Sequence, residues 1–241
     1  MKRLLLCSVL VHSHLLFGGE SLDTNELMRV LRTMPPPEIP KFTADLIRFS
    51  GPRDQIACAS NLVQLVLRLN PSATLPVVGA VARAVPETAA AISHVAAKER
   101  PDAAAWIAGA AVDAAPNRAG AVVFAVCSAV PHQTRAIALA AHRAAPGQAE
   151  PILKAVAEAR PDLRPSLISE LAAARHGGIS VTHSLEQAER ALAFSAEASR
   201  RSTNSGTVHQ GPPDRRPNPP GHQGPPRGPP DPPGGRNYAR P

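Results

Sequence analysis

Aromatic side chains are scarce: phenylalanine, tryptophan and tyrosine together make up 3% of the 241 residues, and there is a single tryptophan. Large hydrophobic cores depend heavily on such side chains, since each one buries about 150–250 Å². Hydrophobic residues nevertheless account for 44% of the chain, and most of them are alanine or aliphatic. The composition excludes a core built on aromatic clusters and favours one built from many small contacts.

Cysteine is scarce as well, with three residues in the chain. Cys7 lies in the N-terminal segment, which leaves Cys58 and Cys127 for the body of the protein. Two cysteines are too few for a disulfide-dense scaffold. Buried, unpaired thiols that act as small hydrophobic groups are the favoured interpretation, and a pairing of the two stays open.

Motifs of known chemistry are missing. The chain has no GxSxG, HExxH, phosphate-loop or dinucleotide-binding pattern, and its nine histidines show no metal-ligand spacing. The carboxylates are interpreted as helix caps and surface charge: Glu87, Asp102, Asp113, Glu158 and Asp162. The sequence therefore predicts a protein without catalytic residues, cofactor or metal.

A proline recurs every fifteen residues through the middle of the chain and opens segments of similar pattern: Pro71, Pro86, Pro101, Pro116, Pro131, Pro146 and Pro161. Counted from its proline, position 7 of each segment is a branched aliphatic residue: Val77, Ile92, Ile107, Val122, Ile137, Ile152 and Leu167. Such regular spacing identifies an internal repeat. Residues 56–70 match the same frame without the proline, so the repeat domain is predicted to span residues 56–175.

Each repeat is predicted to be one short helix. Apolar residues at positions 4, 7, 11 and 14 follow the helical period, and further apolar positions widen the stripe to about 200°, so the helix must be covered on two sides. Extra prolines at position 5 or 6 fit only a first helical turn: Pro76, Pro151 and Pro165. We therefore expect helices over positions 3–14, capped at position 2, for example by Ser72, Asp102 and Asp162.

Connections of two or three residues should fold successive helices back on each other. The predicted fold is all-α, an α-solenoid-like array of stacked short antiparallel helices. A compact orthogonal array of helices is the alternative.

The N-terminal part is expected to hold a signal peptide and a cap. In residues 1–19, Lys2 and Arg3 precede an apolar run and then small residues, as in a secretory signal. The alternative is an amphipathic N-terminal helix. Residues 20–55 are interpreted as capping helices joined by a proline-rich spacer. No other segment approaches the length of a membrane span, so the mature chain should have no transmembrane segment.

The C-terminal part should close the stack and then lose regular structure. Residues 176–201 are interpreted as a glycine corner and a closing helix, with a capping box at Ser184 and Gln187. Residues 202–241 are interpreted as a disordered tail, because twelve of the last 31 residues are proline and six are glycine.

The net charge is +7, and the six arginines and two aspartates after residue 200 contribute +4 of it. Nucleic acid is not favoured as a partner because the arginines are sparse and interrupted by proline. Binding of nucleic acid or of an anionic polymer through this basic tail is the alternative function.

Positions 6, 9 and 13 should form the outward strip of each helix. Most residues there are small or charged, and the large apolar exceptions are Trp106, Phe124 and Leu139. If alternate helices face the same way, Trp106 and Leu139 share one surface with Arg143. Tryptophan and arginine are enriched in binding hot spots, so these three residues are the candidate partner surface. The alternative is that the terminal helices cover them.

The proline-opened, alanine-rich fifteen-residue pattern resembles repeats in uncharacterised exported bacterial proteins. The resemblance covers residues 56–175 and implies an alanine-rich helical body behind a signal peptide, without an activity or a cofactor. Together these features predict a non-enzymatic scaffold in the bacterial periplasm or outside the cell, whose partner is a protein or a cell-envelope polymer.

Overall fold

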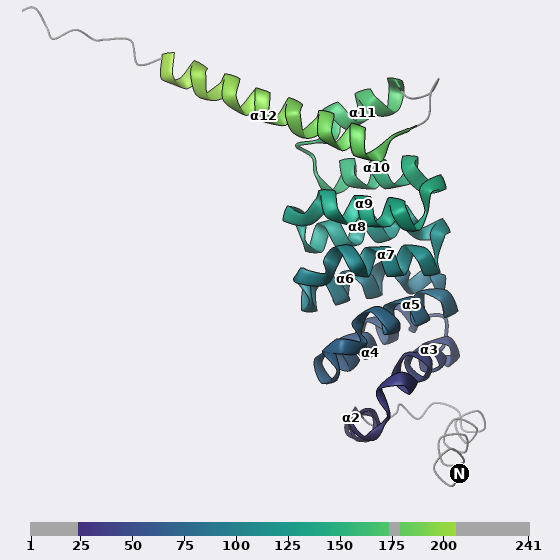
Figure 1. Cartoon of the computed structure of the whole chain (residues 1–241). Helices are drawn as coiled ribbons and strands as arrows, with labels where there is room; N and C mark the ends of the chain where they lie inside the picture. The colour runs from purple at the N-terminus through teal and green to yellow at the C-terminus, as the bar shows by residue number, and fades with distance from the viewer. Residues whose placement is uncertain (1–23, 174–178, 206–241) are drawn as a thin grey trace, which may run out of the picture. The chain divides into compact units, whose positions relative to one another are not determined.

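The computed structural model describes residues 24–173 and 179–205, and every regular element in these ranges is a helix (Figure 1). The α-helices are α2 (Thr24–Thr33), α3 (Ile39–Phe49), α4 (Gln55–Leu69), α5 (Thr74–Ala84), α6 (Ala89–Glu99), α7 (Ala104–Ala114), α8 (Ala119–Ala129), α9 (Thr134–Ala144), α10 (Ala149–Ala159), α11 (Arg164–Ala173) and α12 (Val181–Ser205). The expected signal peptide (1–19) and most of the expected tail lie outside the described residues. The chain divides into two compact units, Met1–Ser199 and Arg200–Pro241, and the contacts described below belong to the first.

Six repeats begin with a 3₁₀ turn over positions 1–3, which continues directly as an α-helix over positions 4–14. These turns are η2 (Pro71–Ala73), η3 (Pro86–Thr88), η4 (Pro101–Ala103), η5 (Pro116–Arg118), η6 (Pro131–Gln133) and η7 (Pro146–Gln148). Position 15 departs furthest from the helical conformation, with φ −140° and ψ 80° at Val85. The following proline forces this break, because it excludes the residue before it from the α region.

The predicted cap at position 2 is wrong. The residue at position 15 ends one helix and starts the next: the amide of Val85 donates to Val81, and its carbonyl accepts from Thr88. Proline at position 1 has no amide to satisfy, so no capping side chain is needed. The position-2 residues, such as Asp102, lie inside the 3₁₀ turn.

The predicted helical phase is confirmed. All seven position-7 side chains are fully buried, and all six position-13 side chains from Arg83 to Glu158 are exposed. The buried set is dominated by alanine, valine and isoleucine, as the composition predicted.

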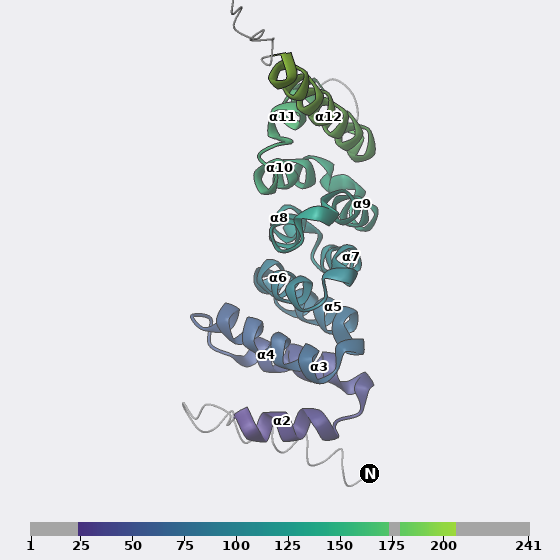
Figure 2. The ribbon, with the colours of Figure 1, turned by 90° about the vertical axis from the view of Figure 1, so that its left-hand side faces the viewer.

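The helices stack in two layers, which confirms the α-solenoid-like array over a compact orthogonal one (Figure 2). One layer contains α4, α6, α8 and α10, and the other contains α3, α5, α7 and α9. The most extensive contacts join helices two repeats apart in the same layer. Smaller contacts join consecutive helices across the layers.

The lead-in contains one repeat that the fifteen-residue spacing did not reveal. The turn η1 (Pro36–Glu38) and α3 have the same 14-residue form as the later repeats, and α3 stacks on α5. The prolines interpreted as a spacer therefore open a helix, and Pro40 lies in its first turn. Five residues, 50–54, separate this unit from α4 and displace it from the common spacing.

The last repeat departs from the alternation of layers. α11 stacks on α10, whereas the regular pattern would place it on α9. α12 lies over α9 instead, as Figure 2 shows. It begins at Val181 after Ser180, whose hydroxyl accepts a hydrogen bond from the amide of His183. The predicted capping box at Ser184 is therefore wrong, and Ser184 is buried within the helix.

Candidate functional site

Stacked helices in one layer meet in a constant register. A Cβ atom built on Gly109 would lie 3.7 Å from the carbonyl oxygen of Ala140, thirty-one residues later. The same offset relates Gly120 to Pro151: a Cβ atom built on Gly120 would lie 3.1 Å from the carbonyl oxygen of Pro151. Position 5 of one helix therefore faces position 6 of the next helix in its layer, and position 9 faces position 10.

This register places Leu75 of α5 opposite Trp106 of α7. Trp106 is 68% exposed and Leu75 is 37% exposed, and Pro76 beside Leu75 is also exposed. Ala110, one turn beyond Trp106, and Ala136 of α9 are small. We call these five residues (Leu75, Pro76, Trp106, Ala110 and Ala136) the Trp106 surface. It is an apolar area in which Trp106 is the most exposed side chain.

Charged side chains border the Trp106 surface one turn further along the helices. Arg83 of α5 and Asp113 of α7 lie 3.8 Å apart across the layer, and both side chains are largely exposed. Arg143 of α9 continues this row and donates a long hydrogen bond of 3.4 Å to the carbonyl of Leu139 in its own helix. An exposed ion pair of this kind contributes little to stability, about 0–1 kcal/mol. The border is thus hydrated and of mixed sign.

The structure separates the three predicted surface residues. Trp106 and Arg143 are exposed, whereas Leu139 is half-buried and packs against the hydrophobic core. Leu139 stands at position 9, which points toward the next helix in the layer, so it is not a free member of the candidate surface.

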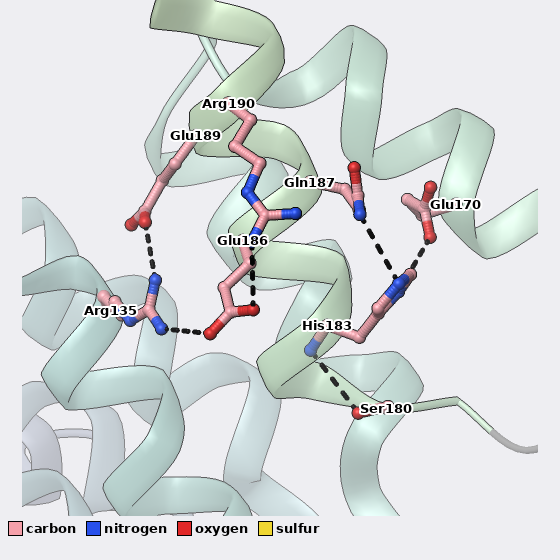
Figure 3. A network of polar contacts seen from close by, with 8 residues as sticks. All are labelled: Arg135, Glu170, Ser180, His183, Glu186, Gln187, Glu189 and Arg190. Atoms are coloured by element: carbon pink, nitrogen blue, oxygen red, sulfur yellow. Dashed lines mark hydrogen bonds and ion pairs between the residues drawn. The ribbon is translucent and has the colours of Figure 1, made fainter.

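A network of half-exposed ion pairs fixes α12 on α9 (Figure 3). The guanidinium of Arg135 donates to Glu186 and to Glu189 of α12, both at 2.7 Å. Hydrogen bonding to these two carboxylates, Glu189 first, raises the pKa of Arg135 above its usual value. On the other side of α12, His183 lies 3.8 Å from Glu170 of α11. The sequence offered no signal for Arg135, because its partners are more than fifty residues away.

A second set of residues missed by the sequence reasoning holds the corners of the α5, α7 and α9 layer. Arg100 donates to both oxygens of Asp102, at 3.2 and 3.0 Å, and also to the carbonyl of Pro71 in the preceding corner of that layer. Arg160, Asp162 and Pro131 repeat this arrangement. The available signal was the triplet Arg-Pro-Asp, which occurs twice in the chain, sixty residues apart. These residues tie successive repeats together and are structural.

The other layer contains a polar hollow between α4 and α6. Its volume is about 450 Å³, and it is lined by Gln64, Arg68, His94, Val95, Lys98 and Glu99. Glu99 accepts hydrogen bonds from Arg68 and Gln64, and the bond from Arg68 is the main reason that its pKa lies below the usual value. His94 is engaged with the carbonyl of Ala125 at 2.9 Å. Glu99, Arg68 and Gln64 thus bond to one another, and His94 bonds to the backbone of α8.

The described residues contain no group of three His, Cys, Asp or Glu side chains suited to a metal ion. Cys58 and Cys127 are free thiols. Burial raises the pKa of Cys127 to about 12, which keeps it protonated and unreactive at neutral pH.

Within residues 24–173 and 179–205, no helix combines the length and the apolar character that crossing a bilayer requires. Comparison with models of protein families, with curated proteins and with solved structures finds no match for the chain. The Trp106 surface is therefore the candidate functional site on the strength of its own chemistry.

Proposed function

We propose that this protein is a non-enzymatic helical-repeat scaffold that binds another macromolecule through the Trp106 surface. The observation that carries the proposal is the 68% exposure of Trp106, the only tryptophan in the chain. Burying an aromatic side chain of this size in an interface contributes more than burying its alanine neighbours, and tryptophan is enriched among the residues that dominate binding energy.

The architecture supports a binding role. Stacked repeats expose a continuous surface, and proteins of this kind commonly use it to hold a partner. Ile107, one residue after Trp106, already provides the buried position-7 contact of α7. The indole is therefore free to act at the surface without weakening the core.

The chemistry of the surface favours a protein partner with an apolar segment. The five residues of the Trp106 surface carry no charge, and the nearest cation in the neighbouring row, Arg83, lies beside Asp113. An anionic polymer requires clustered unpaired cations, because its affinity comes from neutralised phosphates or similar groups. An apolar side chain of a protein can instead pack against the indole and the small alanines beside it, Ala110 and Ala136.

We also propose that the chain is exported. The proposal rests on the sequence of residues 1–19, where two basic residues precede an apolar run and small residues. N-terminal sequencing of the protein recovered from the cell envelope and the medium tests it. A mature N-terminus near residue 20 supports export, and an intact Met1 in a cytosolic fraction contradicts it.

Comparative capture tests the binding role. The full chain, Trp106→Ala and Phe124→Ala are immobilised in parallel and exposed to the native envelope fraction, and bound proteins are quantified by mass spectrometry. Phe124 is the matched control, an exposed aromatic residue on the opposite layer at 43% exposure. We expect a partner that Trp106→Ala loses about tenfold or more and Phe124→Ala retains, as for a hot-spot tryptophan.

Two results would contradict the proposal. Equal capture of every protein by the wild-type chain and Trp106→Ala would remove the Trp106 surface from the function. Capture that disappears near physiological salt and requires the residues after Ser202 would favour the basic tail and an anionic polymer instead. Tryptophan emission of the wild-type chain gives an independent reading with a purified partner, because burial of Trp106 should shift it to shorter wavelength.

A further inference from the structure

The polar hollow between α4 and α6 is separate from the Trp106 surface. It belongs to the layer of α4, α6, α8 and α10, whereas Trp106 belongs to the other layer. Its volume of about 450 Å³ lies within the range of about 300–1,000 Å³ that is typical of sites for small molecules. The hollow is therefore large enough for a ligand of its own.

The register of the repeats explains why polar side chains gather here. Gln64 and Arg68 occupy positions 9 and 13 of α4, and His94 and Lys98 occupy the same positions of α6. In the stack from α3 to α10, every other pair of successive helices in a layer has a glycine or an apolar residue at position 9 of at least one helix: Ala44, Gly79, Gly109, Phe124 and Leu139. Only α4 and α6 bring two long polar side chains together at this position.

Hydrogen bonds hold these side chains in place. Oε1 of Glu99 accepts from Nε2 of Gln64 at 2.7 Å. The same oxygen accepts from Nε and Nη2 of Arg68, at 3.2 and 3.0 Å. Nδ1 of His94 lies 2.9 Å from the carbonyl oxygen of Ala125. Because a carbonyl oxygen can only accept, Nδ1 carries the proton, and Nε2 of the neutral ring is an acceptor.

The same side chains keep bonding capacity for a ligand. Among residues 24–173 and 179–205, no protein group bonds to Nε2 of His94, to Oε1 of Gln64 or to Nη1 of Arg68. Lys98 is exposed and forms no ion pair with the described residues. Two of the side chains that line the hollow are positive, Arg68 and Lys98, and one is negative, Glu99, so their formal charges sum to +1.

We propose that this hollow binds a small hydroxylated carboxylate, such as a sugar acid. The carboxylate beside Lys98 neutralises the excess positive charge through a charge-assisted hydrogen bond. A hydroxyl group both donates and accepts, so the hydroxyls of such a ligand can bond to the acceptors of His94 and Gln64 and to the remaining N–H groups of Arg68. The positive charge disfavours a metal cation, and a zwitterion would leave this charge uncompensated. The inference does not depend on the proposed function.

Titration of the ¹⁵N-labelled full chain with D-glucuronate, followed by amide chemical shifts, tests the proposal. We expect shifts in α4 and α6 and a dissociation constant on the order of 1 mM, because the site is open and offers few charged contacts. D-glucose lacks the carboxylate, and cyclohexanecarboxylate keeps the ring and the charge but lacks the hydroxyls. Each of these two compounds should bind about tenfold more weakly than D-glucuronate.

Lys98→Ala should weaken the binding of D-glucuronate about tenfold, with an unchanged circular dichroism spectrum. Lys154→Ala is the matched control, because Lys154 is an exposed lysine of the same layer that pairs with Glu150 in its own helix at 2.6 Å. It should bind like the wild-type chain. Trp106→Ala should also bind D-glucuronate normally, so failure of this proposal is distinguishable from failure of the proposed function.

Four outcomes would overturn the proposal. One is the absence of shifts in α4 and α6 up to about 20 mM D-glucuronate. Another is a set of shifts confined to the residues after Ser205, which would assign the binding to the basic tail. Equal binding of D-glucose or of cyclohexanecarboxylate would mean that the predicted contacts are not used. Equal losses in Lys98→Ala and Lys154→Ala would remove the hollow from the binding.

Discussion

Replacing Ile107 by alanine should be among the most damaging single changes in the repeat domain. Ile107 occupies position 7 of the central helix α7 and is fully buried. The change removes three carbon atoms from the core, at about 0.8 kcal/mol for each buried methylene-sized group. The same-layer neighbours α5 and α9 hold the backbone of α7 on both sides, so the vacated space cannot collapse fully. If roughly 40 Å³ persists, the cavity adds about 1 kcal/mol, at about 24 cal/mol per Å³. The expected loss is therefore about 3–4 kcal/mol, within the usual range for such substitutions.

Urea denaturation followed by circular dichroism at 222 nm measures this loss. Trp106→Ala is the control, because Trp106 precedes Ile107 in the chain but is 68% exposed, and its removal should change the unfolding free energy by about 0.5 kcal/mol or less. Ile107→Val should fall between them, at about 0.5–1.5 kcal/mol. Arrays of repeats can unfold in more than one step, so the slope of the transition is compared together with its midpoint.

One result would refute the reasoning behind this prediction. If Ile107→Ala and Trp106→Ala shift the midpoint equally, position 7 is not the inner face of the helix and position 6 is not the outer one. The assignment of the Trp106 surface would then fall with the helical phase.

Three further predictions follow from single contacts. In the free protein the emission of Trp106 should be red-shifted and open to a soluble quencher such as iodide or acrylamide; protected, blue-shifted emission would place the indole in an interior. Gly120→Ala should destabilise the protein by about 1–3 kcal/mol, because the added Cβ atom would lie 3.1 Å from the carbonyl oxygen of Pro151. Gly147→Ala is the control and should be neutral in thermal denaturation, because nothing lies within 4 Å of its Cβ position. Equal melting temperatures for the two variants would contradict the close stacking of α8 and α10. The hydrogen bond from Arg100 lowers the pKa of Asp102 from its ordinary 3.8, so the stabilisation it gives is complete above that value and is lost as the pH falls through the lowered pKa. Asp102→Asn should flatten the acid limb of stability measured from pH 5 to pH 2, and an unchanged limb would mean that the contact is absent in solution.

The local pattern of the sequence determined much of the secondary structure and burial of this protein. The spacing of the prolines and the apolar period are properties of consecutive residues, so they placed the repeat, its buried position 7 and its exposed position 13 without knowledge of the fold. The outward placement of Trp106 on its helix also followed from its position in the repeat, but whether another helix covers it did not. The exact start of each helix could not be predicted in this way. The choice between a cap at position 2 and a 3₁₀ turn after position 15 depends on backbone hydrogen bonds, which the pattern of side chains does not report.

The way repeats meet was decided by tertiary structure alone. Five inserted residues moved the unit that opens at Pro36 out of phase, so only its stacking on α5 identifies it as a repeat. The offset of thirty-one residues between stacked helices, which sets Leu75 beside Trp106, arises from how two helical surfaces fit and not from either sequence by itself.

The C-terminal end shows the same limit most clearly. By spacing, α11 is an ordinary repeat, and its Ile168 should be as buried as the other position-8 residues, whereas it is 55% exposed. Whether such a residue is covered depends on which helix comes next in space, and here Arg135 draws α12 to α9 through two glutamates distant in the sequence. The sequence by itself determined which face of each helix is apolar. Only the three-dimensional arrangement decided which of those faces remains open to water, because coverage is a property of neighbouring helices.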